Sequence, residues 1–102
     1  FYNMQSITPN VLQQLLDKQK DILLIDVRQP HEHSHFNIGG RLIPLDDIIQ
    51  YGSEIPTDNP VIVYCQKGIR SAIAIQRLEA KFGMKNLINL QGGIDAWIRA
   101  KS

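Results

Sequence analysis

The sequence predicts an α/β fold in which a central, mainly parallel sheet is covered by helices on both faces. Three short runs are apolar almost throughout, as in strands buried on both faces: residues 22–25, 61–64 and 87–90. Segments with apolar residues at helical spacing alternate with these runs, from Pro9 to near Gln19 and from Ser71 to Phe82. Strands that alternate with helices form parallel sheets through crossover connections, and this alternation gives the fold class.

The ends of these segments carry the expected signals. Thr8 and Pro9 are typical of an N-cap and a first helical position. We expect Gly83 to end the helix that runs from Ser71 to Phe82. The shorter elements we expect are an edge strand at 6–7, a strand at 41–44, a brief helix at 46–51 and a final helix at 94–99.

Length and composition narrow the class of protein. The 102 residues suffice for one core, so we expect a single domain over 6–102 behind a disordered or cloning-derived tail, residues 1–5. Eleven basic against ten acidic residues give a net charge of +1, which predicts neither a nucleic-acid nor a membrane partner. No signal peptide or membrane-spanning run is visible, and one cysteine cannot form an internal disulfide, which fits a reducing cytoplasm.

The one cysteine, Cys65, lies where the strand at 61–64 ends and a short polar loop leads into a helix. Backbone N–H groups of such a turn, together with the helix dipole, favour the nucleophilic thiolate form. Gly68 lets the backbone curl around the sulfur, and Arg70, assisted by Lys67, could hold an anionic substrate. Alternatively, Cys65 is a small buried apolar residue, as free cysteine often is. The loop chemistry favours the nucleophile.

Charged residues follow the first buried strand, at Asp26, Arg28 and Glu32. Asp26 or Glu32 could act as a general base. We favour a charged network that braces the loops around the thiol, because charged groups at strand ends are usually paired.

Two further features have a functional and a structural interpretation. His31, His33 and His35 could bind a metal, but alternate residues of a helix do not share a face. We therefore expect solvated histidines and no metal. Trp97 could face a substrate, but its position three residues after Ile94 favours packing of its helix onto the core.

Three stretches together resemble the rhodanese family of sulfurtransferases. The segment C-Q-K-G-I-R-S, residues 65–71, resembles the family's active-site loop; residues 25–32 resemble its D-V-R-x-x-x-E segment; residues 90–97 resemble its G-G-x-x-x-W segment. The resemblance runs from Ser6 to Trp97. It implies a three-layer rhodanese-like fold with a five-stranded sheet, and structural support of the site by Asp26, Arg28, Glu32 and Ser71.

The resemblance implies transfer of sulfane sulfur through a persulfide on Cys65, without a metal or organic cofactor. Thiosulfate or a protein persulfide would be the donor, and a thiol, cyanide or a sulfur carrier protein the acceptor. Covalent catalysis of this kind splits one difficult transfer into two easier ones. The residues expected to bind the donor and stabilise the persulfide are Gln66, Lys67, Gly68, Ile69 and Arg70.

The stretch N-I-G-G-R-L-I-P, residues 37–44, is similar to rhodanese domains fused to adenylyltransferases of molybdopterin and thiamine biosynthesis. That similarity implies a ubiquitin-like sulfur carrier protein or a cysteine desulfurase as partner. Lys67 and Arg41 would then lie on the rim of the cleft.

Two other classes remain as alternatives. Cysteine phosphatases and arsenate reductases also place a thiolate ahead of an arginine, but with five residues between them, whereas four separate Cys65 from Arg70. Non-catalytic rhodanese-like interaction modules often lack the cysteine, which is present here.

Overall fold

The computed structural model describes residues 4–18 and 21–102. Five strands, parallel at every pairing, form one sheet in the order β1-β5-β4-β2-β3, which confirms the predicted α/β class. The strands are β1 (Ser6–Ile7), β2 (Leu23–Asp26), β3 (Arg41–Leu42), β4 (Val61–Tyr64) and β5 (Leu87–Leu90). Because β4 lies in the middle of the sheet, the loop that follows it opens at the centre of the carboxyl edge, where open α/β sheets bind ligands.

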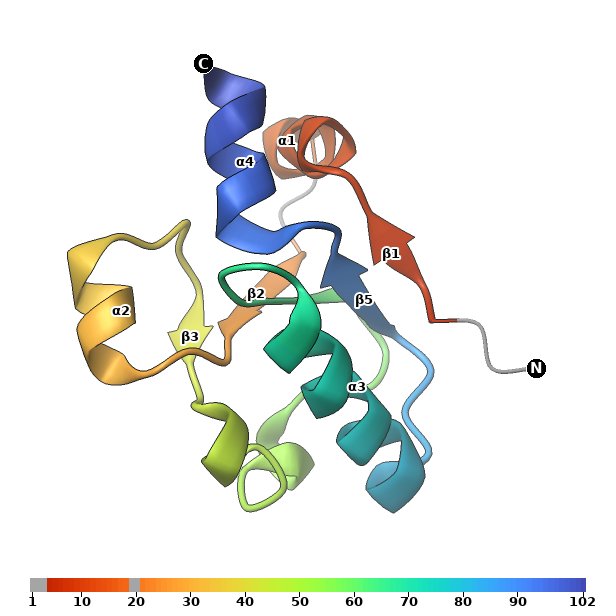
Figure 1. Ribbon diagram of the computed structural model, residues 1–102. Helices are drawn as coiled ribbons and strands as arrows, with labels where there is room; N and C mark the ends of the chain where they lie inside the picture. Colours follow the sequence, from red (N-terminus) through yellow and green to blue (C-terminus); the bar gives the residue numbers. More distant parts are fainter. Residues whose placement is uncertain (1–3, 19–20) are drawn as a thin grey trace.

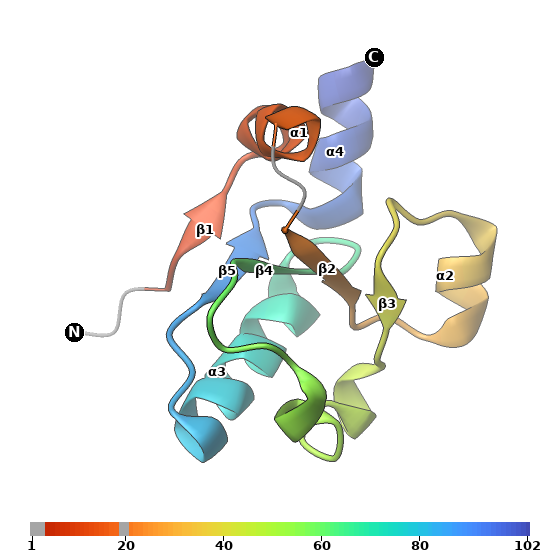
Figure 2. The same cartoon turned by 180° about the vertical axis from the view of Figure 1, so that it is seen from behind.

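Helices cover both faces of this sheet. On one face, α1 (Pro9–Lys18) and α4 (Gly93–Lys101) lie side by side, and α3 (Ile69–Phe82) covers the opposite face (Figure 1). The short α2 (Pro30–His35) lies beyond the edge strand β3, outside these layers, as the view from behind also shows (Figure 2). No helix among residues 4–18 and 21–102 is long and apolar enough to cross a membrane.

The alternation of side chains along β4 explains why the domain has two apolar clusters. Val61 and Val63 belong to the cluster that α3 covers, whereas Ile62 and Tyr64 belong to the cluster under α1 and α4. Successive side chains of a strand point to opposite faces, so a strand covered on both sides is apolar throughout. Full burial of a side chain such as Ile62 contributes about 1.5–3 kcal/mol to folding.

The helix ends follow the predicted signals where the structure describes them. The Thr8 side-chain oxygen accepts a hydrogen bond from the Val11 amide at 3.3 Å, as expected for an N-cap. Gly83 adopts a left-handed conformation, with φ of 66°, directly after α3, and confirms the expected C-terminal signal. The predicted end of α1 near Gln19 lies outside the described residues.

Two of the expected elements need correction. The strand expected at 41–44 is shorter and covers only Arg41–Leu42. The brief helix expected at 46–51 is instead a pair of 3-10 turns, Leu45–Asp47 and Gly52–Glu54. Gly52 begins the second turn and packs so closely on the Phe82 ring that a Cβ there would lie 2.1 Å from a ring carbon. This contact with α3 sets the path of the segment, and local spacing does not reveal it.

The tail expected over residues 1–5 lies only partly within the described residues. Residues 1–3 lie outside the described residues, but Met4 packs against the cluster that α3 covers. The Gln5 carbonyl accepts a hydrogen bond of 2.9 Å from the Asn89 amide, which extends the β1–β5 pairing by one residue. Pairing with β5 therefore orders the chain before Ser6.

Candidate active site

Cys65 follows β4 and lies in a pocket of about 330 Å³ at the carboxyl edge of the sheet. The pocket is lined by Cys65, Gln66, Lys67, Ile69 and Arg70. The Cys65 sulfur accepts hydrogen bonds from two backbone amides, that of Gly68 at 3.1 Å and that of Ser71 at 3.3 Å. Amides aimed at one atom in this way stabilise a negative charge on it. The residue itself is only 1% exposed, so the sulfur lies at the base of the pocket.

The first two carbonyls of the cysteine loop are held by α4. The Cys65 carbonyl accepts a hydrogen bond from the Ile94 amide at 2.9 Å, and the Gln66 carbonyl accepts one from the Asp95 amide at 3.0 Å. These amides belong to the first turn of α4, whose N-H groups have no partner within the helix. Gly93 allows this approach, since a Cβ there would lie 2.4 Å from the Cys65 oxygen. Gly93, the first residue of α4, therefore shapes the cysteine loop.

A second set of bonds fixes the loop from β5. The Ser71 hydroxyl lies 3.4 Å from the Cys65 sulfur and donates to the Asn89 side-chain oxygen at 2.5 Å. The Asn89 side-chain nitrogen in turn donates to the Gly68 carbonyl at 3.1 Å. Sequence analysis did not select Asn89. The available signal was a polar residue in an otherwise apolar, buried strand, since buried polar groups need hydrogen-bond partners.

Asp26 and Arg28 form a buried ion pair beneath the loop. Asp26 is 0% and Arg28 2% exposed, and two Arg28 nitrogens donate to the carboxylate at 2.9 and 3.0 Å. His33 on α2 places its Nδ1 2.9 Å from the same carboxylate. His33 is thus not merely solvated, as the spacing of the histidines suggested, because the start of α2 folds back over Asp26.

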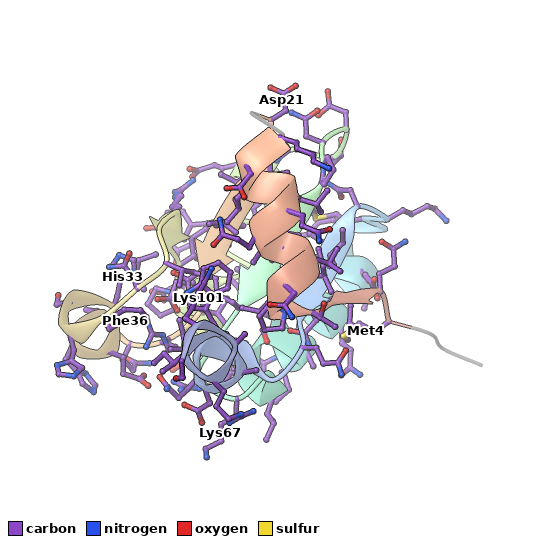
Figure 3. The ribbon with its side chains drawn as sticks, turned by 90° about the horizontal axis from the view of Figure 1, so that it is seen from above. Met4, Asp21, His33, Phe36, Lys67 and Lys101 are labelled. Carbon is purple, nitrogen blue, oxygen red and sulfur yellow. The ribbon has the colours of Figure 1, made fainter. Side chains whose placement is uncertain are left out.

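The Gln66 side chain connects this pair to α4. Its oxygen accepts a hydrogen bond from Arg28 at 3.0 Å, and its nitrogen donates to Asp95 at 2.6 Å. The bond from Gln66, followed by the nearby Lys67 ammonium, lowers the pKa of Asp95. Lys67 lies 3.5 Å from the other Asp95 oxygen and projects outward beside α4 (Figure 3). Sequence analysis assigned only a binding function to Gln66 and did not select Asp95.

Arg70 and Glu32 form a bidentate ion pair at the edge of the pocket. The two terminal guanidinium nitrogens of Arg70 donate to the two Glu32 oxygens at 2.8 and 2.9 Å. Glu32 also accepts a hydrogen bond from the Gln29 amide at 3.0 Å in a capping box at the start of α2. The bond from Arg70 is the largest cause that lowers the pKa of Glu32 to about 2, against the opposing effect of burial. The same pairing raises the pKa of Arg70.

Other sequence candidates lie away from the pocket. Arg41 is not among the lining residues; it pairs with Glu54 at 2.8 Å and lies 5.4 Å from the centre of the Tyr51 ring. Trp97 packs against the apolar cluster under α1 and α4, as predicted. Within the described ranges, no three histidine, cysteine or acidic side chains are grouped so that they could hold a metal ion.

Comparison with known proteins gives the family. The model of the rhodanese-like domain matches residues 8–100. The chain belongs to the rhodanese-like domain family. Among solved structures, a rhodanese-like domain protein from Staphylococcus aureus is 32% identical, with a TM-score of 0.83, and the match covers 92% of this chain and 91% of that one.

Two curated relatives have the word sulfurtransferase in their names. A protein from Allochromatium vinosum named sulfurtransferase is 38% identical over 97 residues, covering 94% of this chain and 90% of the relative. The probable adenylyltransferase/sulfurtransferase MoeZ of Mycobacterium tuberculosis is 39% identical over 98 residues, covering 92% of this chain. The chain spans only 24% of the length of MoeZ, so it corresponds to one part of that protein.

Proposed function

We propose that this rhodanese-like domain is a sulfurtransferase that carries sulfane sulfur as a persulfide on Cys65. The observation that supports it most strongly is the pair of amides, from Gly68 and Ser71, that donate to the cysteine sulfur at the base of an open pocket. A nucleophilic thiolate needs such stabilisation, and the pocket leaves room above it for a second sulfur atom.

The first half-reaction loads the sulfur. The Cys65 thiolate attacks the outer sulfur of the donor and forms a new S–S bond. The donor's own S–S bond breaks, and its electron pair leaves with sulfite when the donor is thiosulfate, or with a thiolate when the donor is a persulfide. The amides of residues 66–70 would stabilise the anionic terminal sulfur, much as an oxyanion hole stabilises oxygen.

The second half-reaction transfers the sulfane sulfur from Cys65 to an acceptor. A nucleophile such as cyanide or a thiolate attacks the terminal sulfur, and the S–S bond to Cys65 breaks. The electron pair returns to Cys65, so the thiolate is regenerated and no electron acceptor is needed. A free thiolate of this kind works in a reducing compartment, and we therefore propose a cytoplasmic location.

Steady-state assays test this proposal. The wild-type domain should form thiocyanate from cyanide and a sulfane donor, and Cys65→Ser should abolish it. The matching phosphatase assay, with p-nitrophenyl phosphate, should give no Cys65-dependent hydrolysis, because the four-residue spacing to Arg70 is one shorter than the phosphatase pattern. Phosphate release without thiocyanate would favour the phosphatase alternative. Neither activity, in a folded domain, would favour a non-catalytic interaction module.

A protein acceptor is a finer part of the proposal. The name of the MoeZ relative joins adenylyltransferase to sulfurtransferase, which supports a ubiquitin-like sulfur carrier activated as an acyl-adenylate. The Cys65 persulfide would attack that adenylate, displace AMP, and leave the sulfur on the carrier as a thiocarboxylate once the S–S bond is reduced by a thiol. A cysteine desulfurase would supply the sulfur as its own persulfide. The test mixes persulfidated domain with an adenylylated carrier and a thiol and looks for the thiocarboxylate by mass spectrometry.

A further inference from the structure

The two cationic side chains that line the pocket are both paired with carboxylates from other elements. Arg70 is bound by Glu32 on α2, through two hydrogen bonds of 2.8 and 2.9 Å. Lys67 lies 3.5 Å from Asp95 on α4. An anion that enters the pocket therefore meets two cations whose charges are already balanced by two carboxylates.

The pairing of Arg70 is the stronger of the two. Both terminal nitrogens of its guanidinium are used, which is the geometry that recognises carboxylates and oxyanions. The Glu32 carboxylate is held in place independently, because it also accepts the Gln29 amide in the capping box of α2. It remains ionised well into acid, since its pKa is about 2. A free oxyanion must displace a carboxylate that is tethered beside Arg70.

We propose that Glu32 is a specificity-determining residue, which occupies Arg70 and thereby disfavours sulfur donors with an oxyanion head, such as thiosulfate, relative to alkyl persulfides, which have no oxyanion head. This inference rests on the proposed sulfur transfer at Cys65. A donor without an oxyanion head has no oxygens to pair with the Arg70 guanidinium, and the pocket offers its alkyl part Ile69, a residue that is 66% exposed beside Cys65. The loading step is then an exchange in which the persulfide's outer sulfur bonds to Cys65 and its thiolate leaves.

The test is Glu32→Gln, which keeps the shape of the side chain and removes its charge. The measured quantity is the ratio of kcat/KM for thiosulfate to kcat/KM for mercaptoethanol persulfide. This ratio does not depend on the fraction of protein that is folded and active. We expect it to rise at least ~10-fold, mainly through a lower KM for thiosulfate, because one charge-assisted pair becomes available to the donor.

Two further variants make the result specific. Glu54→Gln removes the same charge from the Arg41–Glu54 pair, which lies away from the pocket lining, and should leave the ratio unchanged. In an Arg70→Gln background, Glu32→Gln should no longer raise the ratio. A ratio that stays constant in Glu32→Gln would overturn the proposal, since the Glu32 charge would then have no effect on donor preference. A ratio that falls would also overturn it, since it would mean that Glu32 orients Arg70 for thiosulfate.

A binding measurement separates this proposal from the proposed function. Sulfite, the anion that leaves thiosulfate, is titrated into the Cys65→Ser domain with and without Glu32→Gln. We expect Glu32→Gln to tighten sulfite binding at least ~10-fold, whereas Glu54→Gln should not. Absence of sulfur transfer from either donor in the wild type would contradict the proposed function alone. Unchanged sulfite affinity in Glu32→Gln would contradict the specificity proposal alone.

Discussion

The Gly68 amide donates a hydrogen bond of 3.1 Å to the Cys65 sulfur. The residues that hold this loop in place belong to other segments of the chain. The Cys65 carbonyl is bound by the first turn of α4, and the Gly68 carbonyl by Asn89 on β5. The environment of the sulfur is therefore built by the β5–α4 segment as much as by the loop itself.

Gly93→Ala should disrupt the site. A Cβ at Gly93 would lie 2.4 Å from the Cys65 oxygen, so the loop or α4 must move. Gly83→Ala is the matched control, because Gly83 is also left-handed, with φ of 66°, but has nothing within 4 Å of its Cβ position. The free energy of unfolding of the control should fall by only roughly 1–2 kcal/mol, which is the cost of placing alanine in the left-handed conformation. Gly93→Ala should lose more stability in urea unfolding and at least ~10-fold in thiocyanate formation. Equal losses in both variants would contradict the packing argument.

Asn89→Ala should lower the rate of sulfur transfer in protein that remains folded. It removes the acceptor of the Ser71 hydroxyl and the donor to the Gly68 carbonyl, which should cost about 1–3 kcal/mol of stability. Without these bonds the loop is held less firmly, so the Gly68 and Ser71 amides are less well aligned with the sulfur. We therefore expect kcat to fall about 10-fold. Asn86→Ala is the control, since Asn86 donates to the Pro56 and Asn59 carbonyls, away from the pocket lining. A normal kcat in Asn89→Ala would rule out positioning by this residue.

The ion pair of Asp26 and Arg28 should matter far more for stability than an exposed pair. Asp26→Asn leaves the Arg28 charge buried without its partner, and we expect a loss of about 3–5 kcal/mol in urea unfolding. Glu54→Gln breaks the exposed pair with Arg41 and should cost less than about 1 kcal/mol. Similar losses in the two variants would show that the buried charge is stabilised by other groups.

The pKa of Glu32 predicts a pH dependence of stability. Its value in the folded domain, about 2, is below the ordinary 4.5, so the folded state favours the ionised carboxylate. This contribution is complete above about pH 4.5 and is lost as the pH falls toward about 2. Thermal unfolding should therefore show a steeper loss of stability over this window in the wild type than in Glu32→Gln. Parallel curves for the two proteins would contradict the lowered pKa.

Local patterns were enough to predict the main elements and the cysteine loop. The strands at 61–64 and 87–90 were found because a parallel strand buried on both faces is apolar along its length. Gly83 was found because the left-handed turn after a helix favours glycine. The loop after Cys65 was selected because the backbone N–H groups of a strand-to-helix turn favour a thiolate, and because residues 65–71 resemble the rhodanese active-site loop.

The pairings across the site could not be predicted from spacing. Glu32 and Arg70 are 38 residues apart, and no local pattern says that α2 brings one against the other. Asp95 was overlooked because its partner Gln66 reaches it from a different strand–helix connection. Gly93 was predicted only as part of the glycine pair that ends the last strand, and its close approach to the Cys65 carbonyl depends on the packing of α4 against the loop.

Intact-protein mass spectrometry after a single loading step tests the central claim most directly. The wild-type domain and Cys65→Ser are each mixed with excess mercaptoethanol persulfide or thiosulfate, with no acceptor present, and freed of small molecules. The account predicts that the wild type gains the mass of one sulfur atom, that Cys65→Ser gains none, and that added cyanide removes the gained mass as thiocyanate. A wild-type mass that does not change with either donor, or an equal gain in Cys65→Ser, would contradict it.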